Sequence, residues 1–135
     1  MPTMLEDKDE IREVLAEYCF QLDDARFAEM AALFAEDGTW DTAFGTATGR
    51  AAIAELARDI RARAGEPRPR AVHLVTNIAI TLEGTRARVR SNWTLVQNSP
   101  QGPKIGSAGA YHDEMVKKDG RWVFHYRKID RFIAA

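Results

Sequence analysis

Residues 86–97 read RARVRSNWTLVQ, and arginine alternates with small or apolar residues over the first half of this stretch. A period of two places successive side chains on opposite faces, which indicates a β-strand with one face turned toward a core. In the preceding stretch, residues 71–83, the apolar side chains that share one parity are Val72, Leu74, Ile78, Ile80 and Leu82. Glu83 and Gly84 separate the two stretches as a turn. The sequence therefore predicts two adjacent antiparallel strands.

The rest of the second half continues this pattern. Residues 105–116 and 121–133 are predicted as two more strands, joined by a hairpin turn at residues 118–120. Gly106 and Gly109 lie inside the first of these strands, where they can host bulges. A strand of 12 residues spans about 40 Å, which is long for a small domain, so we expect the sheet to bend.

The first half has the helical period instead. Apolar residues recur at intervals of three and four along the first helix, at Ile11, Val14, Leu15, Tyr18 and Leu22. Further helices are predicted over residues 25–34 and 50–63, with a short strand over 39–44 and a turn over 45–49 between them, and residues 65–70 form a linker. Helices followed by an antiparallel meander predict an α+β fold with the helices on one face of the sheet. A bent sheet covered in this way encloses a hollow suited to a small molecule.

Length and composition limit the class of protein. The 135 residues fit one domain, 1–135, and 45% hydrophobic with 29% charged residues is ordinary globular usage. A formal net charge of -1 argues against a protein that holds nucleic acid by bulk electrostatics. The single cysteine, Cys19, excludes a disulfide framework within the chain. Because the chain has no run of 18 apolar residues and no secretory pattern at its acidic N-terminus, we expect a cytoplasmic protein without a membrane partner.

Three polar residues are the main candidates for a chemical role. Tyr18 lies within the apolar stripe of the first helix, which fits either a core tyrosine with a hydrogen-bond partner or a hydroxyl that points into the hollow. Asp23 lies near the negative end of that helix, where a carboxylate is disfavoured unless it is solvated, supports the turn or has a cationic or N–H partner. His73 is the natural partner, because a carboxylate fixes the tautomer through one ring N–H and leaves the other ring nitrogen as a base. We therefore expect Asp23 and His73 to meet.

The sequence gives little support for other chemistry. His112 and His125 have no metal-binding spacing to His73 and are predicted to lie on a solvated face, so we expect no metal site. The chain has no P-loop, no G-x-G-x-x-G dinucleotide loop and no G-x-S-x-G nucleophile elbow. We therefore expect no cofactor.

Several short motifs follow one another along the chain. In order they are Tyr18-x4-Asp23, Leu33 to Gly38 with Trp40, Gly49-Arg50-x2-Ile53, His73-x3-Asn77, Gly109-x-Tyr111-x-Asp113, Gly120-Arg121-Trp122 and Arg127. This series resembles the SnoaL-like family of the nuclear-transport-factor-2-like superfamily, and the resemblance covers nearly the whole chain. It implies a cone: a curved antiparallel sheet wrapped around three N-terminal helices, which encloses a deep apolar pocket.

The resemblance also implies a function. Scytalone dehydratase, hexachlorocyclohexane dehydrochlorinase and bile-acid dehydratase share the pattern, and in them a His–Asp pair removes a proton while a leaving group departs. The family's aspartate, histidine and tyrosine fall on Asp23, His73 and Tyr18, and an arginine late in the last strand falls on Arg127. The second histidine of scytalone dehydratase has no counterpart among residues 94–98, which favours the dehydrochlorinase-type pair. Polyketide cyclases and the structural β subunits of ring-hydroxylating dioxygenases share the same pattern, so the fold alone does not decide the activity.

We therefore expect a cofactor-independent lyase or isomerase, of the dehydratase or dehydrohalogenase type, that acts on a small hydrophobic cyclic substrate. His73 would be the general base, Asp23 its orienting carboxylate, Tyr18 a hydrogen-bond donor to a substrate oxygen, and Arg127 a counter-charge. The residues predicted to line the pocket are Trp40, Phe44, Val75, Trp93 and Tyr111. Strand parity favours Val75 most among them.

Two further expectations follow. The alternative function is a non-catalytic binding module or a structural subunit of a larger oxygenase, in which Asp23 and His73 lie apart or side chains fill the pocket. Because one face of the sheet lines the pocket and the other needs a cover, we also expect a homo-oligomer, a dimer or a trimer.

Overall fold

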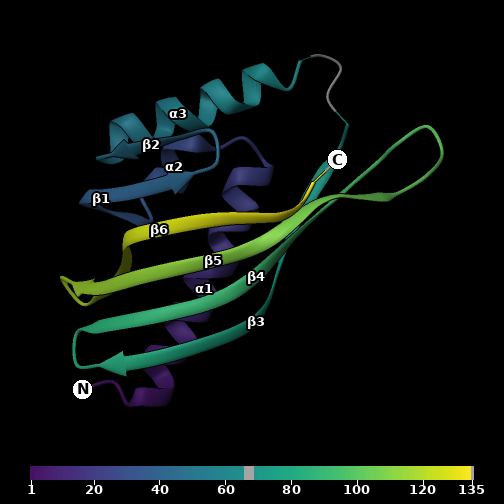
Figure 1. Ribbon diagram of the computed structural model, residues 1–135. Helices are drawn as coiled ribbons and strands as arrows, with labels where there is room; N and C mark the ends of the chain where they lie inside the picture. Colours follow the sequence, from purple (N-terminus) through teal and green to yellow (C-terminus); the bar gives the residue numbers. More distant parts are fainter. Residues whose placement is uncertain (66–68, 135) are drawn as a thin grey trace.

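The computed structural model describes residues 1–65 and 69–134 and places three helices before the last four of six strands (Figure 1). The helices are α1 (Met4–Asp23), α2 (Phe27–Ala31) and α3 (Arg50–Arg63). The strands are β1 (Phe34–Thr42), β2 (Gly45–Thr48), β3 (Ala71–Glu83), β4 (Arg86–Gln97), β5 (Lys104–Lys118) and β6 (Arg121–Ala134). The predicted α+β class is confirmed.

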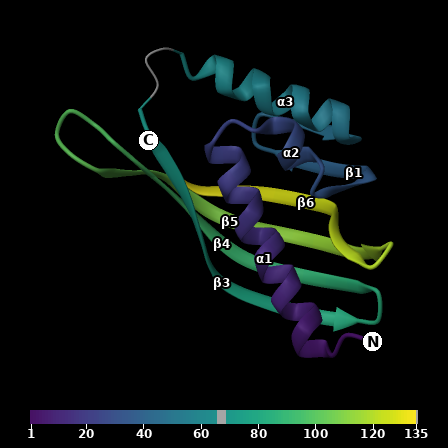
Figure 2. The ribbon, with the colours of Figure 1, turned by 180° about the vertical axis from the view of Figure 1, so that it is seen from behind.

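The six strands form one curved sheet in the order β2-β1-β6-β5-β4-β3. The last four strands form the predicted antiparallel meander, whereas β1 pairs in parallel with β6. All three helices lie on one face of this sheet, and α1 runs diagonally across it (Figure 2). Within the described residues, no helix is long and apolar enough to cross a membrane.

Local sequence sets both ends of α1. The Thr3 hydroxyl accepts a hydrogen bond from the Glu6 N–H at 3.1 Å, and the Glu6 carboxylate accepts one from the Thr3 N–H at 3.1 Å. The helix ends at Asp23, and Ala25 takes a left-handed backbone (φ 58°) that turns the chain toward α2. The buried stripe that packs α1 on the sheet consists of Ile11, Leu15, Tyr18 and Cys19. The helix thereby carries Tyr18 and Asp23 to the inside of the fold.

A bulge divides β3 into two halves. The pairing of β3 with β4 gains one extra residue between Thr76 and Ala79. Asn77 lies within this bulge and takes a left-handed backbone with φ of 55°, a conformation that asparagine tolerates better than most residues. Because successive side chains point to opposite faces, an extra residue reverses the parity that faces the core.

This reversal overturns one prediction from the sequence. Val72 and Leu74 are exposed, whereas the later apolar residues of β3 pack against the core. The prediction that all five share one face is therefore wrong. The bulge lets His73 face the helices together with the apolar residues that follow it, although their numbers differ in parity.

The segment around β1 also differs from the prediction. The second helix ends at Ala31 and does not reach residue 34, because Phe34 begins β1 and Leu33 just before it bonds to β6. The Leu33 carbonyl accepts a hydrogen bond from the Phe124 N–H at 2.9 Å, and the ring centroids of Phe34 and Phe124 lie 5.0 Å apart. Gly38 permits the close approach of the two strands, since a Cβ there would lie 2.9 Å from the Phe124 carbonyl oxygen.

The predicted turn over residues 45–49 is a strand instead. Residues 45–48 pair with β1 as β2, and the register begins with Thr42 opposite Gly45. Ala43 and Phe44 form the tip of this hairpin, and the Phe44 ring centroid lies 5.6 Å from the guanidinium carbon of Arg131 on β6. Of the predicted linker at 65–70, residues 66–68 lie outside the described residues.

Candidate functional site

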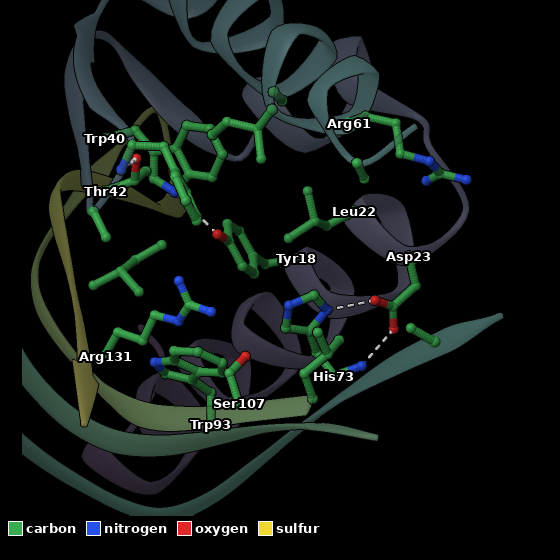
Figure 3. Close-up of a pocket in the computed structure, with 18 of the residues that line it drawn as sticks. Tyr18, Leu22, Asp23, Trp40, Thr42, Arg61, His73, Trp93, Ser107 and Arg131 are labelled. Carbon is green, nitrogen blue, oxygen red and sulfur yellow. Dashed lines mark hydrogen bonds and ion pairs between the residues drawn. The ribbon is translucent and has the colours of Figure 1, made fainter. Parts of the chain in front are cut away.

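A cavity of about 520 Å³ opens between α1, α3, the β1–β2 hairpin tip and the inner face of the meander (Figure 3). Its apolar lining includes Tyr18, Leu22, Phe27, Trp40, Phe44, Ile60, Trp93, Leu95, Tyr111 and Ile129. A few polar side chains converge on the same space, among them Asp23, His73, Ser107 and Arg131. A hollow of this size with an apolar wall and few polar groups is typical of sites for small molecules.

Asp23 and His73 are in contact at one end of the cavity. The carboxylate Oδ1 lies 2.6 Å from the ring Nδ1 of His73, and Oδ2 accepts a hydrogen bond from the backbone N–H of His73 at 2.9 Å. The two side chains are 10% and 16% exposed. The end of α1 and the start of β3 are thus joined by two hydrogen bonds to one carboxylate, which fixes the position of the imidazole.

This contact determines which ring nitrogen is available. An ionised carboxylate can only accept hydrogen bonds, so Nδ1 must carry the proton that it shares with Asp23. The neutral imidazole then has its lone pair on Nε2. Figure 3 shows that the ring of His73 points into the cavity with Nδ1 toward Asp23 and the other nitrogen on the cavity side.

Tyr18 has both features that the sequence left open. It is fully buried, and its hydroxyl accepts a hydrogen bond from the Trp40 indole N–H at 2.9 Å. It also lines the cavity. Burial raises the pKa of Tyr18 far above its usual value of 10, although the nearby Arg127 guanidinium and the Trp40 N–H oppose the rise. Tyr18 is therefore a neutral phenol, and after accepting from Trp40 it still has a proton to donate.

Arg127 lies behind the cavity wall and does not line the cavity. Its side chain is fully buried and forms two hydrogen bonds to Asp113, at 2.8 and 3.2 Å. The guanidinium carbon lies 4.2 Å from the ring centroid of Tyr18 and 3.6 Å from that of Tyr111. The expected counter-charge is thus separated from the cavity by two aromatic rings.

Four of the five predicted pocket walls line the cavity. Trp40, Phe44, Trp93 and Tyr111 do so, whereas Val75 packs against the core and is not among the lining residues. The prediction that Val75 lines the pocket depends on strand parity alone. Parity places its side chain on the inner face, but the cavity is confined to the end of β3 where His73 lies.

Sequence reasoning missed several lining residues, and the polar ones that come from the long strands of the sheet are Ser107 and Arg131. Arg131 has the same parity as Arg127 and Ile129 on β6. Alternation along that strand was therefore a usable signal that its side chain faces inward. Ser107 follows Gly106, where the β4–β5 register shifts, so its direction could not be inferred from parity.

The remaining histidines do not contribute to the cavity. His112 is exposed on the outer face, with Nε2 3.1 Å from a carboxylate oxygen of Asp130. His125 is half-buried and is not among the lining residues. Within residues 1–65 and 69–134 no three side chains of the ligating kinds cluster in a way that could hold a metal ion.

Solved structures with the same architecture are numerous. Rv3472 of Mycobacterium tuberculosis, a protein of unknown function, is 29% identical, with a TM-score of 0.82 over 93% of this chain and 72% of its own. A protein of Novosphingobium aromaticivorans, provisionally assigned as a scytalone dehydratase, is 29% identical, with a TM-score of 0.79 over 96% of this chain and 86% of its own. No curated protein matches the chain.

A third similarity shows the fold alone. A provisionally assigned β subunit of an aromatic-ring-hydroxylating dioxygenase, also from Novosphingobium aromaticivorans, is 20% identical, with a TM-score of 0.78 over 94% of this chain and 90% of its own. A family model also matches, since residues 3–128 match the SnoaL-like domain. Because this match covers almost the whole chain and the helices and curved sheet agree with it, the protein belongs to the SnoaL-like family of the nuclear-transport-factor-2-like fold.

Proposed function

We propose that the protein is a cofactor-independent lyase or isomerase, of the dehydratase or dehydrohalogenase type, that acts on a small hydrophobic cyclic compound. The observation that carries the proposal is the orientation of His73. Asp23 holds its Nδ1 and its backbone N–H, and the other ring nitrogen faces a cavity with a largely apolar wall. The SnoaL-like family includes polyketide cyclases and dehydratases, which is consistent with an activity of this kind.

His73 is the general base in this mechanism. The lone pair on Nε2 takes a proton from a carbon atom of the substrate, and the ring becomes an imidazolium. The Asp23 carboxylate, 2.6 Å from Nδ1, stabilises the positive charge that develops on the ring. Such a base contributes a rate factor of about 10²–10⁴ when it is positioned against the proton that it removes.

The electron pair of the broken C–H bond then has two routes. In an isomerase it moves onto an adjacent carbonyl oxygen as an enolate, and the imidazolium returns the proton to another carbon. In a lyase it forms a C=C bond while the leaving group departs with its own bonding pair; a hydroxide takes the proton from the imidazolium and leaves as water. Neither route needs a redox partner, because the substrate is rearranged or split without net oxidation.

Tyr18 supplies the hydrogen bond that stabilises the developing negative charge. Its phenol is neutral and holds its proton, and the Trp40 indole fixes its position through a hydrogen bond of 2.9 Å. A donor that is positioned before the reaction stabilises charge on a substrate oxygen more effectively than water does. In this proposal Arg127 is a positioning residue, because its guanidinium stacks on Tyr18 and Tyr111 and does not reach the cavity.

The test is exchange of carbon-bound protons, which requires the base but no leaving group. Wild-type protein is expected to accelerate deuterium exchange next to the carbonyl of a cyclic ketone such as 2-tetralone or 1-indanone, followed by ¹H NMR in deuterium oxide. His73→Gln should lower the rate about 10²–10⁴-fold with the fold retained, whereas the control His112→Gln, on the outer face, should have no effect.

Full activity of His73→Gln would refute the assignment of the base. A wild-type protein that binds these ketones in the cavity but catalyses neither exchange nor elimination would favour the non-catalytic alternative. The two residues are in contact and the cavity is open, which is not what that alternative predicts. With such a result the two hydrogen bonds of Asp23 would have a structural role only.

A further inference from the structure

The lining of the cavity is more basic than the protein as a whole. The chain has a formal net charge of -1. Among the residues that the structure describes, however, the charged lining consists of one acid, Asp23, and the four arginines Arg61, Arg63, Arg70 and Arg131. Asp23 is already bound to His73. A concave site with an excess of one charge and low-dielectric walls attracts ligands of the opposite charge.

The four arginines differ in position. Arg63 and Arg70 are exposed, and Arg70 lies 3.9 Å from Asp24. Arg61 is half-buried in the last turn of α3. Arg131 alone of the four comes from the sheet, and Figure 3 shows its guanidinium pointing into the cavity on the same side as Trp93. Arg131 is also solvent-exposed overall, so an anion that enters the cavity can reach it.

The sheet itself directs Arg131 inward. Gly109 of β5 is paired with Trp93 on one side and with Arg131 on the other. Because Gly109 has no side chain, the backbone of β6 packs closely against it: a Cβ at Gly109 would lie 1.9 Å from the Asp130 carbonyl oxygen and 3.0 Å from the Arg131 Cα. The Trp93 indole N–H donates a hydrogen bond to the same Asp130 carbonyl at 3.0 Å, and the Arg131 guanidinium lies 5.6 Å from the Phe44 ring centroid.

No acid within the described part of the chain neutralises Arg131. The neighbouring Asp130 has the opposite parity, and its carboxylate lies 3.1 Å from His112 Nε2 and 3.8 Å from Lys128 Nζ. Arg127 lies four residues earlier on β6 and faces the same side of the sheet. Unlike Arg131, it forms a buried salt bridge with Asp113. An arginine that points into a mostly apolar hollow without such a partner is suited to an anion brought by the ligand.

We propose that the substrate carries a carboxylate and that Arg131 binds it. The inference rests on the proposed function, because it assigns the substrate of that same cavity to a chemical class: a cyclic carboxylate. The guanidinium matches a carboxylate with two parallel N–H···O hydrogen bonds. With the charged group at Arg131, the ring of the substrate lies along Trp93, and its carbon-bound protons face His73. The other three lining arginines, Arg61, Arg63 and Arg70, raise the local concentration of the anion.

The experiment compares a carboxylate with its neutral isostere. Binding of 1-naphthoate and of 1-naphthamide is measured by calorimetry and by the change in tryptophan fluorescence, since Trp40 and Trp93 line the cavity. The wild-type protein is expected to bind the carboxylate about tenfold or more tightly, and added salt should reduce this preference. Arg131→Gln should abolish the preference, because it should lower the affinity for the carboxylate and leave that for the amide unchanged. The matched control is Arg88→Gln on the outer face of β4, which should change neither affinity.

Equal affinity of the wild-type protein for the two compounds, or no binding of either at about 1 mM, overturns the proposal. The proposal is also overturned if Arg131→Gln lowers the affinity for both compounds equally or for neither. His73→Gln should retain the preference for the carboxylate while it loses proton exchange. A missing preference therefore counts against the carboxylate site alone, and exchange that persists in His73→Gln counts against the proposed base alone.

Discussion

Asp23→Asn is expected to move the proton of the His73 ring from one nitrogen to the other while the fold stays intact. In the wild-type protein, one carboxylate oxygen accepts from the backbone N–H of His73 at 2.9 Å and the other from Nδ1–H at 2.6 Å. The backbone group can only donate, so the single oxygen of asparagine must face it. The asparagine NH₂ group then faces Nδ1 and makes that nitrogen an acceptor. The neutral ring consequently carries its proton on Nε2.

The magnitudes follow from this rearrangement. Both hydrogen bonds between the two residues survive, although neither is charge-assisted any longer, so the free energy of unfolding should fall by only about 2 kcal/mol. The lone pair on the cavity side of the ring is lost, so the rate of proton exchange should fall about 10²–10⁴-fold. A large loss of activity in a variant that stays folded, with the proton moved to the other ring nitrogen, is the specific signature, because loss of a merely structural contact would lower stability without moving that proton.

Three measurements check the prediction. Exchange of 2-tetralone protons reports the rate, urea unfolding reports the stability, and the ¹⁵N shifts of the imidazole report which nitrogen is protonated at a pH where the ring is neutral. Asp24→Asn is the matched control, since Asp24 is the adjacent carboxylate and its contact is a single exposed one with Arg70 at 3.9 Å. If Asp23→Asn keeps the wild-type rate, or if its Nδ1 remains protonated, the reasoning is refuted.

Other outcomes are expected on the same grounds. Tyr18→Phe removes the donor to the substrate and leaves the Trp40 indole N–H without its acceptor, so exchange should slow about 10–100-fold and urea unfolding should show a loss of about 1–3 kcal/mol. Burial raises the pKa of Tyr18 and Tyr111, and a hydrogen bond to a carboxylate raises that of Tyr126. Phenolate absorbance should therefore appear in the folded protein only above pH 10. The contribution of these three tyrosines to the free energy of unfolding should be complete below pH 10 and should be lost as the pH rises further. A normal tyrosine titration near pH 10 would contradict this. Leu74→Lys, on the exposed side of β3, should shift the expected homo-oligomer toward monomer in gel filtration, and a wild-type protein that elutes as a monomer at micromolar concentration would exclude the oligomer.

Periodicity located the elements wherever one pattern applied without competition. The helix predicted over residues 50–63 is α3, and the strand predicted over residues 86–97 is β4. Around Phe34 two patterns compete, because an apolar residue there fits the stripe of a helix and the start of a strand equally well. The contact with Phe124, far along the chain, decides in favour of the strand.

The contact between Asp23 and His73 was predictable from the sequence, and the shape of the cavity was less so. A carboxylate at the negative end of a helix is stabilised by a donor, and His73 was a candidate that needed no knowledge of the fold. The inner lining depends on where the sheet curves and which strands bulge. Parity alone therefore favoured Val75, which lies beyond the cavity, and gave no reason to select Ser107.

The direction of His73 shows how one backbone feature decides the chemistry. In a regular strand, His73 and the apolar set Ile78, Ile80 and Leu82 would lie on opposite faces. Burial of a large aliphatic side chain contributes about 1.5–3 kcal/mol, so those three residues would take the inner face and His73 would be turned away from Asp23. The bulge at Asn77 removes this conflict, because both halves of β3 then face inward. No glycine occurs in β3, and asparagine is the residue of this strand best able to adopt the left-handed backbone that the bulge needs. The bulge is thus a condition for the contact between Asp23 and His73, and Asn77 is the residue in the sequence that favours it.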